Sequence, residues 1–212
     1  MVEANNVILK NLTIENASGE VGQAVALSVF SDEVAVINCK LLGNQDTLYA
    51  SGKGRQYYKD CYIEGTTDFI FGSATALFEN CEIYSKKDSY ITAASTPKDS
   101  LFGYVFKDCK LTAGTKVSQV YLGRPWRVYA KTVFINSDLG KHIISVGWHN
   151  WKKLEAEKTT FYAEYNNKGE GFQPEKRVQW SHQLKKRDAK KYTLKNVLGK
   201  YKTSKKEWYE EL

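Results

Sequence analysis

Ile37-Asn38-Cys39-Lys40-Leu41 recurs along this chain, and its copies decide the fold. Clear copies are Lys59-Asp60-Cys61-Tyr62-Ile63, Glu79-Asn80-Cys81-Glu82-Ile83 and Lys107-Asp108-Cys109-Lys110-Leu111, and weaker ones begin at Lys10 and Ile135. From Cys39 onward, the steps between matching positions are 22, 20, 28 and 28 residues. Steps of this size are typical of solenoid coils with loops of varying length.

The segments around these markers alternate apolar and polar residues, as short half-buried strands do. One coil cannot bury its own apolar side, but five or six stacked coils share a continuous core. The sequence therefore predicts an all-β protein, a right-handed parallel β-helix, clearest from residue 4 to about 150. A β-sandwich is the alternative fold, but it gives no reason for Asn or Asp to precede Cys in four successive copies.

The charge divides the chain into two parts. Residues 176–212 carry 12 Lys or Arg and 4 Asp or Glu, a balance of +8, whereas the first 175 residues balance at −1. We expect a β-helix domain over residues 1–182 and a basic, partly helical tail over residues 183–212, with a helix near 188–198 packed on the last coil. The Lys-rich runs 185–187 and 205–206 have little aromatic interleaving, so they predict a solvated face rather than a nucleic-acid site.

Long apolar runs are absent from the sequence. The sequence contains no run of 18 apolar residues, so it predicts no membrane span, and we find no charged-then-apolar leader at its start. The four cysteines share one repeat position, which predicts a ladder of small buried side chains. Neighbouring rungs are close enough for a disulfide, Cys61–Cys81 or Cys39–Cys61, so that alternative stays open.

Two aspartates occupy matching places in neighbouring repeats. Asp46 follows Cys39 by seven residues, and Asp68 follows Cys61 by seven; Tyr49 and Phe71 each follow their cysteine by ten. Equal offsets stack on one face of a solenoid, so the carboxylates should lie about one strand spacing apart, roughly 5 Å. Two such acids resist double ionisation, and an arginine beside one of them would keep that one charged.

Polar and aromatic residues near these aspartates add further chemistry. Gln23 and Gln45 offer neutral N–H donors suited to an oxyanion, and Arg124 offers a guanidinium. Tyr49, Phe71, Trp126 and Trp148 are candidate platforms for sugar rings. Together these residues indicate that the two aspartates divide the catalytic roles, one acting as a nucleophile or base and the other as a general acid.

Five ordered motifs carry a family resemblance: Q-A-V-A-L (23–27), G-N-Q-D-T-L (43–48), D-F-I-F-G (68–72), L-G-R-P-W (122–126) and G-W-H-N-W (147–151). In this order they resemble the pectin methylesterases, or pectinesterases, over roughly residues 4–182. The resemblance implies a parallel β-helix enzyme that removes methyl groups from methylesterified galacturonate in pectin, a polysaccharide substrate, and releases methanol. It implies no metal or organic cofactor, and a secreted or periplasmic location.

The resemblance also implies residue roles. Asp68 resembles the nucleophile, which forms an acyl-enzyme, and Asp46 the general acid that later acts as a base. Gln23 and Gln45 resemble the oxyanion donors, and Arg124 the partner of the nucleophilic carboxylate. The aromatic residues resembling substrate-groove positions are Trp126 and Trp148, with Tyr49 and Phe71 at the rim.

The sequence departs from the family pattern at its beginning. The Gly-x-Tyr-x-Glu motif and the opening coils are not found, and Ser28 and Ser73 stand where many relatives have Arg and Asn. A first coil without a cover exposes apolar side chains and strand edges. We therefore expect either a monomer of reduced stability or self-association through that coil, with Gln23 the least well positioned of the catalytic candidates.

Other functions remain possible on this scaffold. A polygalacturonase also uses paired carboxylates but needs a wider gap for water. A pectate lyase needs a calcium site of several acidic oxygens, and no acidic cluster beyond the pair is evident. A pectin-binding module or an inactive truncated esterase is the alternative of another class.

Overall fold

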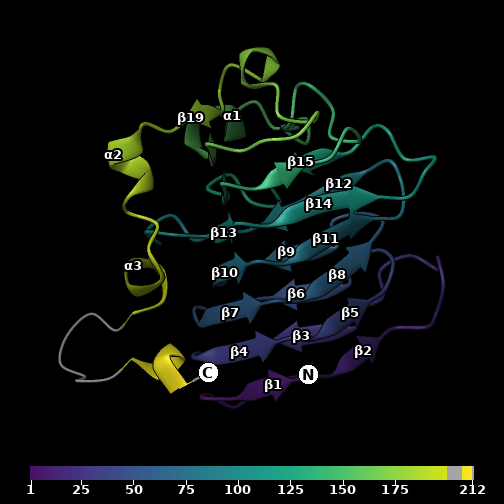
Figure 1. Cartoon of the computed structure of the whole chain (residues 1–212), viewed down its shortest axis with the longest axis vertical. Helices are drawn as coiled ribbons and strands as arrows, with labels where there is room; N and C mark the ends of the chain where they lie inside the picture. Colours follow the sequence, from purple (N-terminus) through teal and green to yellow (C-terminus); the bar gives the residue numbers. More distant parts are fainter. Residues whose placement is uncertain (200–206, 212) are drawn as a thin grey trace.

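The chain folds into a solenoid whose successive coils supply the strands of three parallel sheets (Figure 1). The computed structural model describes residues 1–199 and 207–211. Every strand pair in the three sheets is parallel. The right-handed parallel β-helix predicted from the repeats is confirmed.

The eight-stranded sheet contains β1 (Ile8–Lys10), β4 (Val34–Ile37), β7 (Arg55–Lys59), β10 (Thr75–Glu79), β13 (Tyr104–Lys107), β16 (Lys131–Ile135), β18 (Phe161–Tyr165) and β19 (His182–Gln183). The six-stranded sheet contains β2 (Thr13–Glu15), β5 (Lys40–Leu42), β8 (Tyr62–Gly65), β11 (Glu82–Ser85), β14 (Lys110–Ala113) and β17 (Asp138–Leu139). The five-stranded sheet contains β3 (Leu27–Val29), β6 (Leu48–Ala50), β9 (Ile70–Gly72), β12 (Tyr90–Ala94) and β15 (Tyr121–Gly123).

The repeated Asn or Asp forms the corner between the eight-stranded and six-stranded sheets. Asn38, Asp60, Asn80 and Asp108 all have φ between 49° and 54°, in the left-handed region that Asn and Asp tolerate better than other non-glycine residues. Side chains at this position also pair between coils, as Asn80 Nδ2 donates to Asp60 Oδ1 at 2.6 Å. The marker pattern therefore encodes a backbone corner as well as a buried rung.

The cysteine after each corner points into the core. All four are buried free thiols, so none of the candidate disulfides is formed in this structure. The Cys61 thiol instead contacts the carbonyl oxygen of Val36 at 3.2 Å, on the preceding coil. The core beside this ladder holds a stack of aromatic rings with centroids 4.4–4.6 Å apart, formed by Tyr58, Phe78, Phe106 and Phe134. The cysteines thus serve as small packing residues next to that stack.

The basic tail contacts the last coils through Leu184 and Tyr192, which pack against β16 and β18, and it then continues over earlier coils. It contains α2 (Lys186–Ala189), α3 (Leu194–Leu198) and the 3-10 helix η2 (Trp208–Glu211), and it descends along the outside of the eight-stranded sheet (Figure 1). Val197 and Leu198 are buried against Tyr57, Leu77 and Val105. The outer face of this sheet is apolar there and needs a cover, which explains why the tail runs back over earlier coils. Lys205 and Lys206 lie outside the described residues.

The remaining helices are short. The helix α1 (Ala156–Thr159) and the 3-10 helix η1 (Pro174–Lys176) lie in the connections that precede and follow β18. Within the part of the chain that the structure describes, no helix is long and apolar enough to cross a membrane. The first coil is the least covered: β1 and β2 are edge strands, and Ile8 and Leu12 are 54% and 45% exposed. Self-association through this coil stays a prediction.

Candidate active site

Asp46 and Asp68 lie on adjacent coils, each two residues before a strand of the five-stranded sheet. Asp46 donates its N–H to the carbonyl of Thr67 (3.1 Å), and Asp68 donates its own to Tyr90 (2.8 Å), so the parallel ladder continues through both aspartates. The side chains therefore stack about one strand spacing, roughly 5 Å, apart. Both residues have positive φ, 65° and 49°. Such backbone conformations cluster at functional sites, where the surrounding structure holds them in place.

The two carboxyl groups have different electrostatic surroundings. Burial, followed by the negative charge of Asp68, raises the pKa of Asp46 to about 6. Burial also raises the pKa of Asp68, but hydrogen bonds and the positive charge of Arg124 oppose that rise. The pair is thus arranged to hold one proton on Asp46 while Asp68 is ionised beside the guanidinium.

Arg124 binds Asp68 with two nitrogens. Its Nε donates to Oδ1 at 2.9 Å and its Nη2 donates to Oδ2 at 2.7 Å, while Nη1 has no hydrogen-bond partner among the described residues. Arg124 directly follows β15, and its N–H is fixed by the carbonyl of Thr92 at 2.9 Å. A fork-to-carboxylate pair of this kind fixes the orientation of the carboxylate as well as its charge.

Two aromatic rings cover Arg124, and neither was identified from the sequence. The guanidinium carbon lies 4.0 Å from the ring centre of Tyr90 and 3.7 Å from that of Trp151. Tyr90 begins β12, one coil beyond Asp68, so its register position was available as a signal. Trp151 is the second tryptophan of G-W-H-N-W, but nothing in that motif alone says which tryptophan faces the site.

The prediction that Trp148 is a substrate-groove aromatic is wrong. Its side chain is 1% exposed and stacks on Tyr162 with centroids 4.3 Å apart, close to Phe134. It belongs to the solenoid core and does not line a groove. Three residues later the chain turns through positive φ at Trp151 and Lys152, and that turn leaves Trp151 on Arg124.

The two glutamines lie side by side in the ladder next to Asp46. Gln23 and Gln45 form an isolated parallel bridge, which places their side chains on neighbouring coils. The Gln23 side chain is close enough to Asp46 to oppose the rise in its pKa and is exposed, whereas Gln45 is half-buried. The pair can therefore present amide donors beside the carboxyl groups.

The remaining aromatic candidates gather on the same sheet. Tyr49 and Phe71 stack with ring centroids 4.5 Å apart and planes inclined by 7°, and Trp126 lies 6.3 and 5.9 Å from them. Phe30 packs edge-on against Tyr49 at 5.2 Å and was not identified from the sequence. These rings form an apolar strip next to the aspartates, half-buried except for the exposed Phe30.

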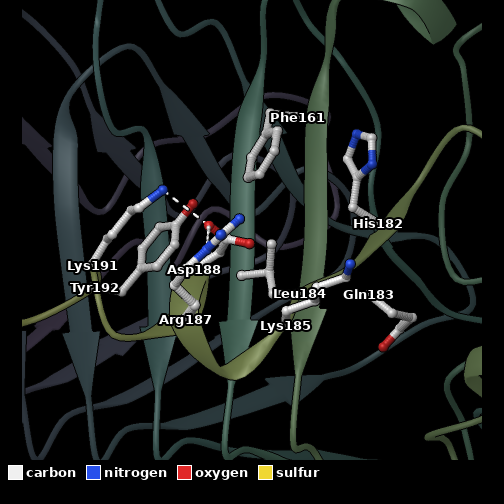
Figure 2. Close-up of a pocket in the computed structure, with 9 residues that line it drawn as sticks. All are labelled: Phe161, His182, Gln183, Leu184, Lys185, Arg187, Asp188, Lys191 and Tyr192. Carbon is white, nitrogen blue, oxygen red and sulfur yellow. Dashed lines mark hydrogen bonds and ion pairs between the residues drawn. The ribbon is translucent and has the colours of Figure 1, made fainter.

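A hollow lies away from the two aspartates, between β18, β19 and α2 (Figure 2). Its cations are Lys185, Arg187 and Lys191, and its one carboxylate, Asp188, is paired with Lys191 at 3.0 Å. A single ion-paired carboxylate cannot divide acid and nucleophile roles, so this hollow lacks the pair of carboxyl groups that Asp46 and Asp68 provide. In the described residues, no group of three or more His, Cys, Asp or Glu is arranged to hold a metal ion.

Fold and site together define a β-helix protein with an asymmetric pair of carboxyl groups, one of them held by arginine. The pectinesterase family model matches residues 1–201. The chain is 44% identical over 186 residues to Pectinesterase 31 of Arabidopsis thaliana, covering 87% of this chain and 58% of that protein. It is 42% identical over 180 residues to Probable pectinesterase A of Neosartorya fischeri, with 83% and 54% covered. The chain belongs to the pectinesterase family.

Solved structures agree with this assignment. The pectin methylesterase from carrot superposes with a TM-score of 0.85 at 32% identity, over 91% of this chain and 65% of that one. A pectin methylesterase in complex with a hexasaccharide superposes with a TM-score of 0.78 at 29% identity, over 93% and 71%. The chain spans little more than half the length of these two curated relatives.

Proposed function

We propose that this protein is a carboxylic ester hydrolase that removes methyl groups from methylesterified galacturonate in pectin and releases methanol. The observation that carries the proposal is the division between the two carboxyl groups. Asp46 has a pKa raised to about 6, while Asp68 accepts hydrogen bonds from two nitrogens of Arg124. An ester hydrolysis with a covalent intermediate needs such a pair of a proton donor and an ionised nucleophile.

In the first half-reaction, an Asp68 oxygen attacks the ester carbonyl carbon and forms a C–O bond. The carbonyl electrons move to its oxygen, and this oxyanion accepts hydrogen bonds from the amides of Gln23 and Gln45. Collapse of the intermediate breaks the bond to the methoxy group, which takes the Asp46 proton and leaves as methanol. An anhydride between Asp68 and the sugar carboxyl remains.

In the second half-reaction, ionised Asp46 accepts a proton from water as the water oxygen attacks the sugar acyl carbon. The Asp68–acyl bond breaks and Asp68 leaves as a carboxylate, again held by Arg124. Asp46 has its proton back, and the sugar carboxyl group ionises into solvent. One ester and one water thus become one carboxylate, one proton and one methanol.

The aromatic strip supports a polysaccharide substrate. Tyr49, Phe71 and Trp126 present ring surfaces next to the two aspartates, and planar rings are suited to the apolar faces of sugars. A solved relative is described in complex with a hexasaccharide. Because the polymer is too large to cross a membrane, we also propose that the protein acts outside the cytoplasm, in a secreted or periplasmic location.

The test is a product assay on highly methylesterified pectin with a chelator present. We expect methanol at a rate proportional to protein concentration, with neither new reducing ends nor unsaturated sugar products. New reducing ends would select a glycosidic hydrolase, and unsaturated products a lyase. Pectin binding without methanol would select a binding module and overturn the proposal.

A further inference from the structure

The guanidinium of Arg124 is restrained on three sides. Asp68 binds one edge through two nitrogens, Tyr90 covers one face at 4.0 Å, and Trp151 lies within 3.7 Å. Cations over aromatic faces at such distances are attracted by the ring quadrupole. Tyr90 is fixed by its place in β12, whereas Trp151 belongs to a loop and must be held by other means.

Trp151 has a backbone conformation that a bulky side chain rarely adopts, with φ of 55°. Its N–H donates to Nδ1 of His149 at 2.9 Å. The following residue, Lys152, also has positive φ, and its N–H donates to the Asn150 side-chain oxygen at 2.8 Å. Two side-chain acceptors, each two residues upstream of its donor, therefore hold this turn.

The same loop is tied to the segment after Arg124. Lys153 Nζ donates to the carbonyls of Pro125 (2.9 Å) and Trp126 (3.0 Å). This anchor fixes the end of the loop, and the His149 hydrogen bond fixes the tryptophan within it. The imidazole packs against the stacked rings of Tyr90 and Tyr121, with ring centroids 5.4 and 5.3 Å away.

His149 can accept this hydrogen bond only while Nδ1 carries no proton. Burial, and then the positive charges of Arg124 and Lys152, lower its pKa below the ordinary value for histidine. The residues around it are these two cations and the aromatic rings of Tyr90 and Tyr121. The neutral ring is therefore favoured, and acid would replace the acceptor with a second N–H facing that of Trp151.

We propose that His149 is a positioning residue: its unprotonated Nδ1 holds Trp151 against Arg124, and loss of this acceptor releases Arg124 from the geometry in which it binds Asp68. His149 touches neither substrate nor reacting atoms and acts through Trp151 and Arg124. Its kinetic consequences rest on the proposed esterase function, whereas its structural consequence does not.

The structural test follows the Arg124 Nε–H by nitrogen-15 NMR, with the signal assigned by its loss in Arg124→Lys. We expect a slowly exchanging signal at neutral pH in the wild type and in His149→Asn, because an asparagine oxygen can accept from the N–H two residues on, as Asn150 does. His149→Ala should lose that protection. Acidification should remove it in the wild type but not in His149→Asn. His182→Asn, on β19, is the matched control and should behave as the wild type.

The kinetic test separates kcat from KM on methylesterified pectin. Because His149→Ala leaves every groove aromatic in place, we expect kcat to fall roughly tenfold to 100-fold, the range for a misplaced catalytic group, with KM nearly unchanged. His149→Asn should restore kcat at neutral pH and extend activity to lower pH.

Three results would overturn the inference: protected Nε–H and full kcat in His149→Ala, a His149→Asn variant as impaired as His149→Ala, or acid loss of the signal in both the wild type and His149→Asn. The wild-type pH titration and His149→Asn decide the question even where His149→Ala fails to fold. Absence of methanol from all variants would reject the esterase proposal and leave the NMR comparison valid.

Discussion

Two arginine–carboxylate pairs in this molecule have the same chemistry and opposite surroundings. Arg177 and Glu164 form one pair, with Nε to Oε2 at 2.7 Å and side chains only 2% and 0% exposed. Arg124 and Asp68 form the other, with side chains 17% and 8% exposed. In the buried pair, the guanidinium also donates to the carbonyls of Ser145 (2.8 Å) and Gly171 (2.7 Å), whereas Nη1 of Arg124 has no partner among the described residues.

The difference separates structural from chemical use of one interaction. Arg177 is bonded through all three nitrogens, so it joins β18 to the turns beside it and has no donor left for a ligand. Arg124 binds Asp68 through two nitrogens and is covered by two aromatic rings, and its Nη1 has no hydrogen-bond partner among the described residues. Changes at the first pair should therefore alter stability, and changes at the second should alter rate.

The largest expected effect is on turnover in Asp68→Asn. An amide cannot act as the nucleophile, so kcat should fall by roughly four orders of magnitude or more, as when a covalent step is removed. The melting transition should remain cooperative. Methanol release above about a tenth of the wild-type rate, with deamidation excluded by mass spectrometry, would remove Asp68 from the nucleophile role.

Glu164→Gln tests the buried Arg177–Glu164 pair and should reduce stability. Removing one partner leaves the charge of Arg177 uncompensated in the core, which destabilises proteins by about 3–5 kcal/mol. Urea unfolding should show this decrease in the free energy of unfolding. The kcat of the folded variant should stay close to that of the wild type. Reduced kcat without reduced stability would mean that the buried pair also shapes the groove.

Much of this organisation follows from the sequence, because solenoid coils repeat local geometry. The Asn or Asp before each cysteine marks a corner with positive φ, and equal offsets from Cys39 and Cys61 place Asp46 and Asp68 on adjacent coils. Trp148 and Trp151 were not separable in this way. Which of them faces the core depends on a turn held by His149, a contact that no repeat spacing encodes. The continuation of the tail over earlier coils was also missed, since Val197 and Leu198 contact strands that lie far earlier in the sequence.

Arg124→Lys should sharpen the comparison by keeping the charge and removing the fork. Lysine cannot bind both oxygens of Asp68 in one plane or fill the space between Tyr90 and Trp151. We expect kcat to fall roughly 100-fold, the loss that a misplacement of about 1 Å can bring. The unfolding free energy should change by less than in Glu164→Gln. Wild-type kcat in this variant would limit Arg124 to a structural or steering role.

The smallest effect concerns the pH dependence of the first half-reaction. In the proposed mechanism Asp46 must hold a proton to release methanol, and its pKa is raised to about 6 by burial and by the charge on Asp68. As pH rises through that value the proton is lost, so kcat/KM should fall by about tenfold per pH unit on the alkaline side.

Glu164 takes no part in this proton transfer, so Glu164→Gln should leave the alkaline decrease in kcat/KM unchanged. Arg124→Lys should shift the pH at which kcat/KM begins to fall, because it changes the charge distribution that Asp46 faces. The pH dependence of kcat/KM reports the free enzyme and the acylation half-reaction, whereas the second half-reaction needs ionised Asp46. The rate of acylation in a single turnover should therefore show the same pH dependence as kcat/KM. A kcat/KM that stays flat between pH 6 and 8 would mean that Asp46 does not supply the proton.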